Sequence, residues 1–304
     1  MAEAEELAQA LLTVRDWLRY SVSRFSQAGL VYGHGTATAL DEAAYLILHT
    51  LQLPIDQLDP WLDARLTLAE RQAVGAIIAK RIAMRKPAPY LTNEAWVQGH
   101  AFYVDERVIV PRSYIGELLG SGLSAVVADP EAVNRVLDLC TGSGCLAILA
   151  ALALPNAVID ASDISADALT VAERNIATYQ LGDRIALVRS DLFAGLAGRT
   201  YDLILSNPPY VSAAAVAAFP PEYAAEPRLA HLGGEHGLDI VLRILAEASA
   251  HLTETGVLVV EIGTGREVLE ETFPGLPFLW LDSADSAGEV FALTAKDVKG
   301  KKGR

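Results

Sequence analysis

The sequence is poor in cysteine and in metal-binding patterns. Among its 304 residues only Cys140 and Cys145 are cysteines, which is too few for a disulfide framework or a cysteine-ligated zinc site. None of the six histidines has metal-ligand spacing with a cysteine or with another histidine. The sequence therefore predicts no metal centre.

Long hydrophobic stretches are missing as well. The longest apolar run, residues 145–154, is about half the length of a membrane-spanning helix. The first ten residues, MAEAEELAQA, are acidic and contain no apolar core of signal-peptide length. These absences predict a soluble, cytoplasmic protein with no membrane partner.

Basic residues are outnumbered by acidic ones. The chain has 24 lysines and arginines against 38 aspartates and glutamates, a formal net charge of -14. Proteins that bind duplex DNA without sequence specificity present a basic surface, so this balance argues against a DNA partner. It favours a basic protein partner, because opposite electric fields accelerate association.

The remaining composition is that of a folded protein with more than one unit. Hydrophobic residues make up 52% of the chain and charged residues 20%, which supports a sizeable buried core. The length exceeds one average domain and falls short of three. We expect a helical domain over residues 1–90, a β-hairpin linker over 91–112, an α/β domain over 113–298 and a flexible basic tail over 299–304.

Apolar side chains recur at helical spacing in the first ninety residues. This spacing predicts one helix over residues 7–25, a second over 38–54, and a third that begins at Thr67 and ends at the prolines after Lys86. Glu70 completes a capping box with Thr67, which strengthens the start of the third helix.

The next segment changes to the spacing of β-strands. Alternating apolar residues over 95–104 and the run 108–110 flank Asp105 and Glu106, which predicts a β-hairpin that turns at these two acids. Arg112 follows the hairpin, and we expect it to anchor the hairpin to the α/β domain.

From residue 135 onward, short apolar strands alternate with helices. The predicted strands cover residues 136–139, 158–162, 185–188, 203–205 and 257–262. Such alternation predicts a parallel sheet with helices on both faces. Sheets of this kind bind ligands at the carboxyl ends of their strands, so the chemistry should follow Leu139, Ser162, Ser190 and Ser206.

A glycine-rich turn, residues 138–144 (DLCTGSG), follows the first of these strands. Gly142 and Gly144 let the backbone approach a ligand where a Cβ atom would collide. Asp138 suits a ligand that carries a cationic ammonium group. A dinucleotide fingerprint would need a third glycine where Ala147 stands. A tight turn that requires only small residues explains the pattern about as well.

Acidic residues also follow the next two strands. Asp163 lies about twenty residues after the glycines, where a carboxylate can accept two hydrogen bonds from a ribose diol. It can instead cap the following helix, although Ser165 could serve as that cap. Asp191 can accept from the amino group of an adenine and Leu192 can pack on its face, but ordinary turn chemistry explains these two residues nearly as well.

The fourth strand ends in the sequence Asn207-Pro208-Pro209-Tyr210. Two prolines remove two backbone donors and stiffen the turn. The Asn207 side-chain oxygen and the Pro208 carbonyl can then each accept one hydrogen from a planar NH2 group, and Tyr210 can lie against its flat face. Two such acceptors would hold a weakly nucleophilic nitrogen in line with an electrophile.

Taken together, these motifs resemble the HemK-like protein-glutamine methyltransferases, which are class I enzymes that use S-adenosylmethionine. The resemblance covers nearly the whole chain. Residues 28–36, 40–45 and 110–118 further resemble the branch that methylates a glutamine of the large-subunit ribosomal protein L-three. Release-factor enzymes of the family usually show P-R-P-D-T-E where this chain has P-R-S-Y-I-G-E at 111–117, a departure that favours the ribosomal-protein branch.

The resemblance implies a Rossmann-like, mostly parallel sheet of seven strands with one antiparallel strand, preceded by a helical substrate-recognition domain and a hairpin. The cofactor-binding candidates are Asp138, Cys140, Thr141, Gly142, Ser143, Gly144, Asp163, Asp191, Leu192 and Asn207. The catalytic candidates are Asn207, Pro208 and Tyr210, and the glutamine-binding candidates are Asn207, Pro208, Pro209 and Tyr210.

Other polar residues carry simpler interpretations. Lys80, Arg81, Arg85 and Lys86 are expected to form a solvated helix end, with contact to ribosomal RNA as an alternative. His231 and His236 are expected at the surface, His34 is expected to fix a loop or touch the protein substrate, and Cys145 should be a small core residue.

Two further functions remain as alternatives. An adenine-specific DNA methyltransferase would use the same N-P-P-Y pocket, but the acidic charge and the small first domain argue against it. A non-catalytic assembly factor with a vestigial cofactor pocket is disfavoured by the intact Asn207–Tyr210 segment. A nicotinamide oxidoreductase is disfavoured by the missing third glycine.

Overall fold

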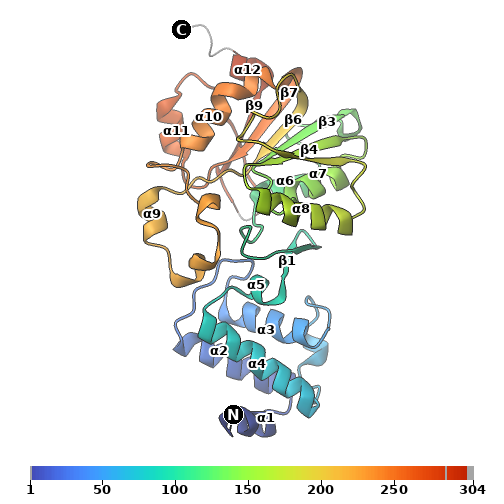
Figure 1. Ribbon diagram of the computed structural model, residues 1–304, viewed down its shortest axis with the longest axis vertical. Coiled ribbons are helices and arrows are strands. Elements are labelled where there is room, and N and C mark those ends of the chain that lie inside the picture. The colour runs from blue at the N-terminus through green and yellow to red at the C-terminus, as the bar shows by residue number, and fades with distance from the viewer. Residues whose placement is uncertain (1, 285, 300–304) are drawn as a thin grey trace. The chain divides into compact units, whose positions relative to one another are not determined.

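The computed structural model describes residues 2–284 and 286–299 and divides the chain into two compact units. The helical unit contains the residues up to Glu94 together with Phe219–Ala225, and the sheet unit contains Ala95–Ala218 and the residues from Glu226 onward. Figure 1 shows the elements of both units. The short segment Phe219–Ala225 therefore returns to the helical unit from within the sequence of the sheet unit.

The helical unit is built from amphipathic helices around one apolar core. Its elements are α1 (Ala2–Ala10), α2 (Val14–Gln27), α3 (Ala39–Thr50), the 3-10 turn η1 (Asp59–Trp61), α4 (Leu68–Met84), α5 (Ala88–Thr92) and the 3-10 turn η3 (Pro221–Ala225). Trp17, Phe25 and Leu46 are among its fully buried side chains. The α4 helix has 17 residues, and no helix in the described part of the chain is long and apolar enough to span a bilayer.

The predicted helix over residues 7–25 is wrong, because the chain breaks between α1 and α2. Thr13 caps α2: its hydroxyl accepts the Asp16 amide hydrogen at 3.2 Å, and the Asp16 carboxylate accepts the Thr13 amide hydrogen at 2.9 Å. This local capping box interrupts an apolar spacing that continues across it. The predicted cap at Thr67 is confirmed, and Glu70 completes its box. Thr38 is the N-cap of α3.

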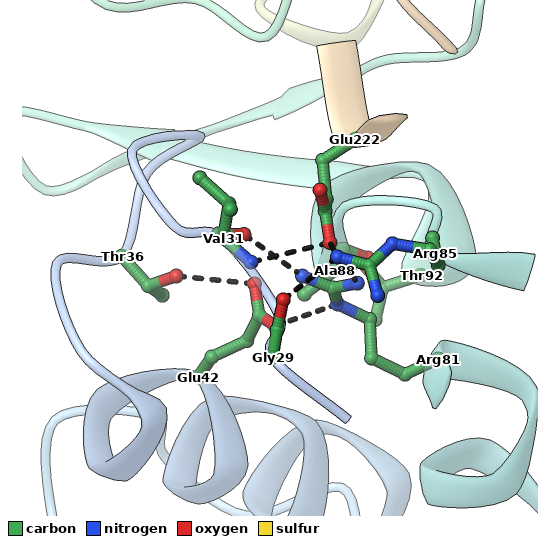
Figure 2. A network of polar contacts seen from close by, with 9 residues as sticks. All are labelled: Gly29, Val31, Thr36, Glu42, Arg81, Arg85, Ala88, Thr92 and Glu222. Carbon is green, nitrogen blue, oxygen red and sulfur yellow. Dashed lines mark hydrogen bonds and ion pairs between the residues drawn. The ribbon is translucent and has the colours of Figure 1, made fainter. Parts of the chain in front are cut away.

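Arg81 and Arg85 do not form a solvated helix end, in contrast to the prediction (Figure 2). The Arg81 side chain is 0% exposed and lies 2.6 Å from the Glu42 carboxylate. It also donates to the Val31 carbonyl at 3.2 Å. Arg85 lies 2.7 Å from the Glu222 carboxylate, which is buried as well. The prediction fails because both carboxylate partners come from distant parts of the sequence.

The sheet unit begins with a hairpin of β1 (Glu94–Val97) and β2 (His100–Tyr103). It turns at Gln98 and Gly99, whose φ angles of 50° and 75° suit a tight two-residue turn. The chain does turn after Asp105, where the Val108 amide donates to the Asp105 carbonyl at 3.1 Å. The predicted hairpin around this turn is wrong, because residues 108–110 form no strand. Asp105 instead accepts from the Arg107 side chain at 2.6 Å.

The predicted seven-stranded sheet is confirmed. Its strands are β3 (Arg135–Leu139), β4 (Val158–Asp163), β5 (Ile185–Arg189), β6 (Tyr201–Ser206), β7 (Leu252–Glu261), β8 (Leu279–Leu281) and β9 (Val290–Thr294). They lie in the order β5-β4-β3-β6-β7-β9-β8, and β9 is antiparallel to both neighbours. Because β3 pairs with β4 on one side and β6 on the other, the topological switch point lies at the carboxyl ends of β3 and β6.

Helices cover both faces of this sheet (Figure 1). Alternate residues of the strands enter two apolar cores, as a sheet that is buried on both sides requires. One core includes α6 (Tyr114–Gly120), α7 (Cys145–Ala153) and α8 (Ala166–Thr178), and the other includes α10 (Asp239–Glu247), α11 (Arg266–Thr272) and α12 (Ala295–Lys299). Cys145 is buried in the first core, as predicted.

The remaining short elements of the sheet unit connect these layers. They are the helix α9 (Ala213–Ala217) and the 3-10 turns η2 (Pro130–Ala132), η4 (Arg228–Ala230) and η5 (Ala248–Ala250). Lys299 was predicted to begin a flexible tail and is instead the last residue of α12. Residues 300–304 lie outside the described part of the chain.

Candidate active site

The carboxyl ends of β3, β4, β5 and β6 border one cavity of about 320 Å³, a size typical of small-molecule sites. The pairing of Leu139 with Ser206 and of Leu139 with Ser162 brings the turns after these strands together. Seven of the predicted site residues line the cavity: Cys140, Gly142, Asp163, Asp191, Leu192, Asn207 and Pro209. Residues more than sixty positions apart in sequence thus meet where the sheet topology predicts.

Asp138 does not line this cavity and lies beneath the glycine-rich turn, fully buried. Its Oδ2 atom accepts from the Thr141 hydroxyl at 2.5 Å and from the Ala147 amide at 3.0 Å, so it joins the turn to α7. Its Oδ1 atom has no hydrogen-bond partner among the described residues. Burial raises the pKa of Asp138 to about 7.

The two glycines of the turn have different roles. A Cβ atom on Gly142 would meet no protein atom within 4 Å, and Gly142 lines the cavity. A Cβ atom on Gly144 would lie 3.1 Å from the Cβ of Ala172, so Gly144 permits the close approach of α8. Both have positive φ angles, and so does Cys140 at 61°. Thr141, Ser143 and Gly144 are buried behind the lining.

Asp163 lines the cavity while both of its carboxylate oxygens are engaged. Oδ2 accepts from the Gly142 amide at 3.0 Å and Oδ1 from the Ser165 amide at 2.9 Å. Ser165 itself is the N-cap of α8, so Asp163 is not needed for that role. Burial is the largest influence on its carboxyl and raises the pKa of Asp163. Each oxygen retains a second lone pair that could accept from a ligand.

The two residues after β5 occupy different environments. Leu192 is buried and presents its side chain at the cavity wall with a φ angle of 48°. Asp191 is exposed, and its Oδ1 atom lies 2.9 Å from a guanidinium nitrogen of Arg243. That exposed ion pair competes with the predicted contact between Asp191 and an adenine amino group, which stays a prediction.

The corner formed by residues 207–210 is held from one side. The Asn207 Nδ2 atom donates to the Arg112 carbonyl at 3.1 Å. Because a carbonyl can only accept, this bond fixes the orientation of the Asn207 amide and leaves Oδ1 as the atom that can accept from a ligand. No donor among the described residues bonds to that oxygen. Asn207 and Pro209 line the cavity, whereas Pro208 and Tyr210 do not.

Glu261 is a buried carboxylate of this corner that the sequence analysis missed. It is the last residue of β7, and its Oε1 atom accepts from the Tyr210 hydroxyl at 3.2 Å. Burial raises the pKa of Glu261 to about 7, and the pKa of Tyr210 is raised by burial and by the nearby carboxylate. The signal in the sequence is an acidic residue directly after the apolar run 257–260.

A second wall of the cavity was also missed, because it comes from irregular segments. Residues 107–109 and four residues between Pro227 and Leu232 line it. Glu226 organises this wall: it accepts from both terminal nitrogens of Arg112 at 2.7 and 2.8 Å and from the Val110 amide at 2.9 Å. His231 lies 2.9 Å from Glu226 and is buried, so its predicted surface position is wrong.

Comparison with known proteins gives consistent results at the level of sequence and fold. Residues 119–219 match the family model described as "Methyltransferase small domain". The "Ribosomal protein uL3 glutamine methyltransferase" of Burkholderia pseudomallei (strain K96243) is 56% identical over 94% of this chain and 95% of its own length. The protein of that name from Neisseria gonorrhoeae (strain ATCC 700825 / FA 1090) is 55% identical over 97% of this chain and 99% of its own length.

A solved structure supports the fold alone. The catalytic domain of hMettl16, in complex with MAT2A 3'UTR hairpin 6, aligns with a TM-score of 0.50 at 14% sequence identity. The alignment covers 73% of this chain and 80% of that chain. At this level of identity the match bears on the arrangement of strands and helices and not on the ligand.

Proposed function

Since this chain belongs to the family of ribosomal protein uL3 glutamine methyltransferases, we propose that it methylates the side-chain amide nitrogen of a glutamine in uL3, the large-subunit protein L-three, with S-adenosylmethionine as donor. One observation carries the proposal for the site. The Asn207 amide is oriented by the Arg112 carbonyl so that its oxygen remains available beside the cavity. A basic ribosomal protein also suits the acidic charge of this chain.

The cavity residues suit S-adenosylmethionine. Gly142 has no side chain, so the cavity beside it stays open to a ligand. Asp163 offers carboxylate oxygens for a ribose diol. Leu192 supplies an apolar surface for an adenine ring. Asp138 supports the turn from beneath through Thr141 and Ala147, and its predicted contact with the cationic end of the cofactor stays a prediction. When bound, the cofactor supplies a methyl group on a positively charged sulfur, which needs no further activation.

The contribution of the protein is then to position the glutamine. The Asn207 Oδ1 atom and the Pro208 carbonyl each accept one hydrogen from the carboxamide NH2 group, which fixes the direction of its lone pair. As positive charge develops on that nitrogen, the two acceptors stabilise it. Tyr210 packs against the flat carboxamide. No general base is required, because a proton on an alkylated amide nitrogen is acidic enough to pass to water.

The test is methyl transfer to purified uL3. Wild-type protein, incubated with methyl-labelled S-adenosylmethionine and uL3 from cells that lack the enzyme, should label a single glutamine-containing peptide in mass spectrometry. Asn207→Ala should abolish most of the label while the protein stays folded. The proposal is wrong if uL3 stays unlabelled by an enzyme that binds the cofactor, or if the label lies on another residue type. A cytoplasmic location and the absence of a DNA partner stay predictions.

A further inference from the structure

Glu261 accepts hydrogen bonds from three donors on two segments. Its Oε2 atom accepts from the Ser113 hydroxyl at 2.6 Å and from the Tyr114 amide at 2.9 Å, and its Oε1 atom accepts from the Tyr210 hydroxyl at 3.2 Å. The residue is 1% exposed. No arginine, lysine or histidine within the described ranges forms an ion pair with it. A buried carboxylate with this set of partners is held only by neutral donors.

The segment that binds Glu261 also binds Asn207. The Arg112 carbonyl accepts from the Asn207 amide at 3.1 Å, and the next two residues, Ser113 and Tyr114, donate to Glu261. Ser113 is in turn fixed as the N-cap of α6. The pairing of Ser206 with Val260 places Asn207 and Glu261 on adjacent parallel strand ends. Residues 112–114 thus connect Glu261 to Asn207, the first residue of the corner 207–210, which we call the acceptor corner.

Tyr210 is confined on a second side by Gly263. A Cβ atom at Gly263 would lie 2.7 Å from the Tyr210 Cε2 atom, and the φ angle of Gly263 is 53°. A glycine is therefore required for the ring to rest on the backbone after β7. With the hydroxyl bonded to Glu261 and the ring against Gly263, Tyr210 has little freedom to rotate.

We propose that Glu261 is a positioning residue for methyl transfer: its carboxylate holds Tyr210 and, through Ser113 and Tyr114, fixes the corner that orients the glutamine carboxamide. The proposal rests on the proposed function, because it assigns Glu261 a role in presenting that glutamine. Glu261 is not expected to contact the cofactor, and it does not line the cavity.

The ionised form of Glu261 should be the one that holds the corner. A carboxylate accepts from Ser113, Tyr114 and Tyr210 at once, whereas a protonated carboxyl must donate one hydrogen, and only a hydroxyl can turn to accept it. Arg112 and Glu289 are the other charged groups that act on Tyr210. Since burial raises the pKa of Glu261 to about 7, turnover at saturating cofactor should rise with pH through neutrality.

Glu261→Gln is the decisive variant. It keeps the volume and one acceptor oxygen. With that oxygen on Ser113 and Tyr114, its NH2 group donates to the Tyr210 hydroxyl, so Tyr210 loses the acceptor that holds it in the wild-type protein. We expect kcat on uL3 to fall by up to about 100-fold, because a small displacement of the bound carboxamide can cost this much, with the dissociation constant of S-adenosylmethionine unchanged by calorimetry. The rise of kcat with pH should disappear. Glu254→Gln is the matched control, because Glu254 is an exposed residue of the same strand.

Tyr210→Phe completes a double-mutant cycle. If Glu261 acts through Tyr210, the double variant should lose little more activity than the worse single variant. A second readout does not need turnover: the ring ¹³C resonance of Tyr210, assigned by its absence in Tyr210→Phe, should titrate near pH 7 in wild-type protein and not in Glu261→Gln. Circular dichroism establishes that each variant is folded.

The outcomes separate the two hypotheses. Wild-type protein that fails to methylate uL3 overturns the proposed function. Wild-type protein that methylates uL3 while Glu261→Gln keeps full kcat overturns the positioning role, as do additive losses in the double variant or a cofactor affinity that falls as much as kcat. A lowered kcat with a flat pH profile, constant cofactor affinity and non-additive losses supports it.

Discussion

The helical unit and the carboxyl ends of β3 and β7 bury carboxylates in opposite ways. In the helical unit, Glu42 lies 2.6 Å from Arg81, and Glu222 lies 2.7 Å from Arg85 (Figure 2). In the sheet unit, Asp138 and Glu261 are equally buried but accept only from hydroxyl and amide groups. All four carboxylates are buried to a similar extent, and they differ in whether an arginine guanidinium lies beside them.

This difference decides what opposes the cost of burying each carboxylate. Burial raises the pKa of Glu42 while Arg81 acts to lower it, and removal of one partner of a buried ion pair leaves an uncompensated charge. Burial alone disfavours the ionised form, and it raises the pKa of both Asp138 and Glu261 to about 7. The uncompensated carboxyls lie beside the proposed cofactor turn and the acceptor corner, where a group that titrates near neutrality can influence activity.

The largest effect should follow removal of Arg81. Arg81→Met leaves the Glu42 carboxylate buried without its cation, which costs about 3–5 kcal/mol in the free energy of unfolding. Lys80→Met is the matched control on the same helix, since Lys80 is exposed. Urea denaturation followed by circular dichroism measures both. Equal stability of the two variants would show that the buried pair in the helical unit is not structural.

Asn207→Ala should leave stability nearly unchanged and act on turnover instead. Loss of one oriented acceptor is expected to lower kcat by about 10²- to 10³-fold, as for other groups that stabilise developing charge. Cofactor affinity should change far less. Asn156→Ala removes a comparable bond, from an exposed amide to the Glu131 carbonyl, and serves as control. Single-turnover kinetics and calorimetry distinguish the two steps, and parallel losses of both would contradict the assigned role.

The pH dependence of stability tests the uncompensated carboxyls directly. The ordinary pKa values of Asp138 and Glu261 are 3.8 and 4.5, and both rise to about 7 in the folded protein. Between these limits the folded state binds more protons than the unfolded chain, so the free energy of unfolding should fall as pH rises towards 7. The fall should be shallower in Glu261→Gln. If the stability of the wild-type protein increased with pH over this range, the raised pKa values of Asp138 and Glu261 would be contradicted.

The smallest effect should come from an exposed ion pair. Asp191 and Arg243 lie 2.9 Å apart with about half of each side chain exposed, and such pairs contribute about 0–1 kcal/mol. Asp191→Asn should therefore barely change the urea midpoint of unfolding. This small change is the reference against which the loss of a buried ion pair is compared. A loss as large as that of Arg81→Met would mean that burial does not decide the strength of these interactions.

The sequence predicts the sheet and most of the cavity because both follow from local patterns. Apolar runs such as 136–139 and 203–205 mark the strands, and parallel pairing brings their carboxyl ends together. Asp163, Leu192 and Asn207 follow from that rule, and each lines the cavity. Cofactor contacts at these residues remain predictions.

The features that the sequence analysis missed depend on partners distant in sequence. From the sequence alone Arg81 and His231 are expected at the surface. Their partners, Glu42 for Arg81 and Glu226 for His231, are not evident from the local sequence. Glu261 looks like the end of a strand, because nothing local shows that Ser113 and Tyr210 donate to it. The misplaced hairpin turn has a local cause: Gln98 adopts a positive φ angle that its residue type seldom shows.

The central claim is that the acceptor corner recognises the NH2 group of a carboxamide. Its most direct test is the affinity of the cofactor-loaded enzyme for uL3 and for uL3 in which the methylated glutamine is replaced by glutamate, an isostere without N–H donors. Calorimetry near neutral pH should show the glutamine form binding more than about tenfold tighter, because the glutamate leaves the Asn207 and Pro208 oxygens facing a charged acceptor. Equal affinity for the two forms would contradict the account.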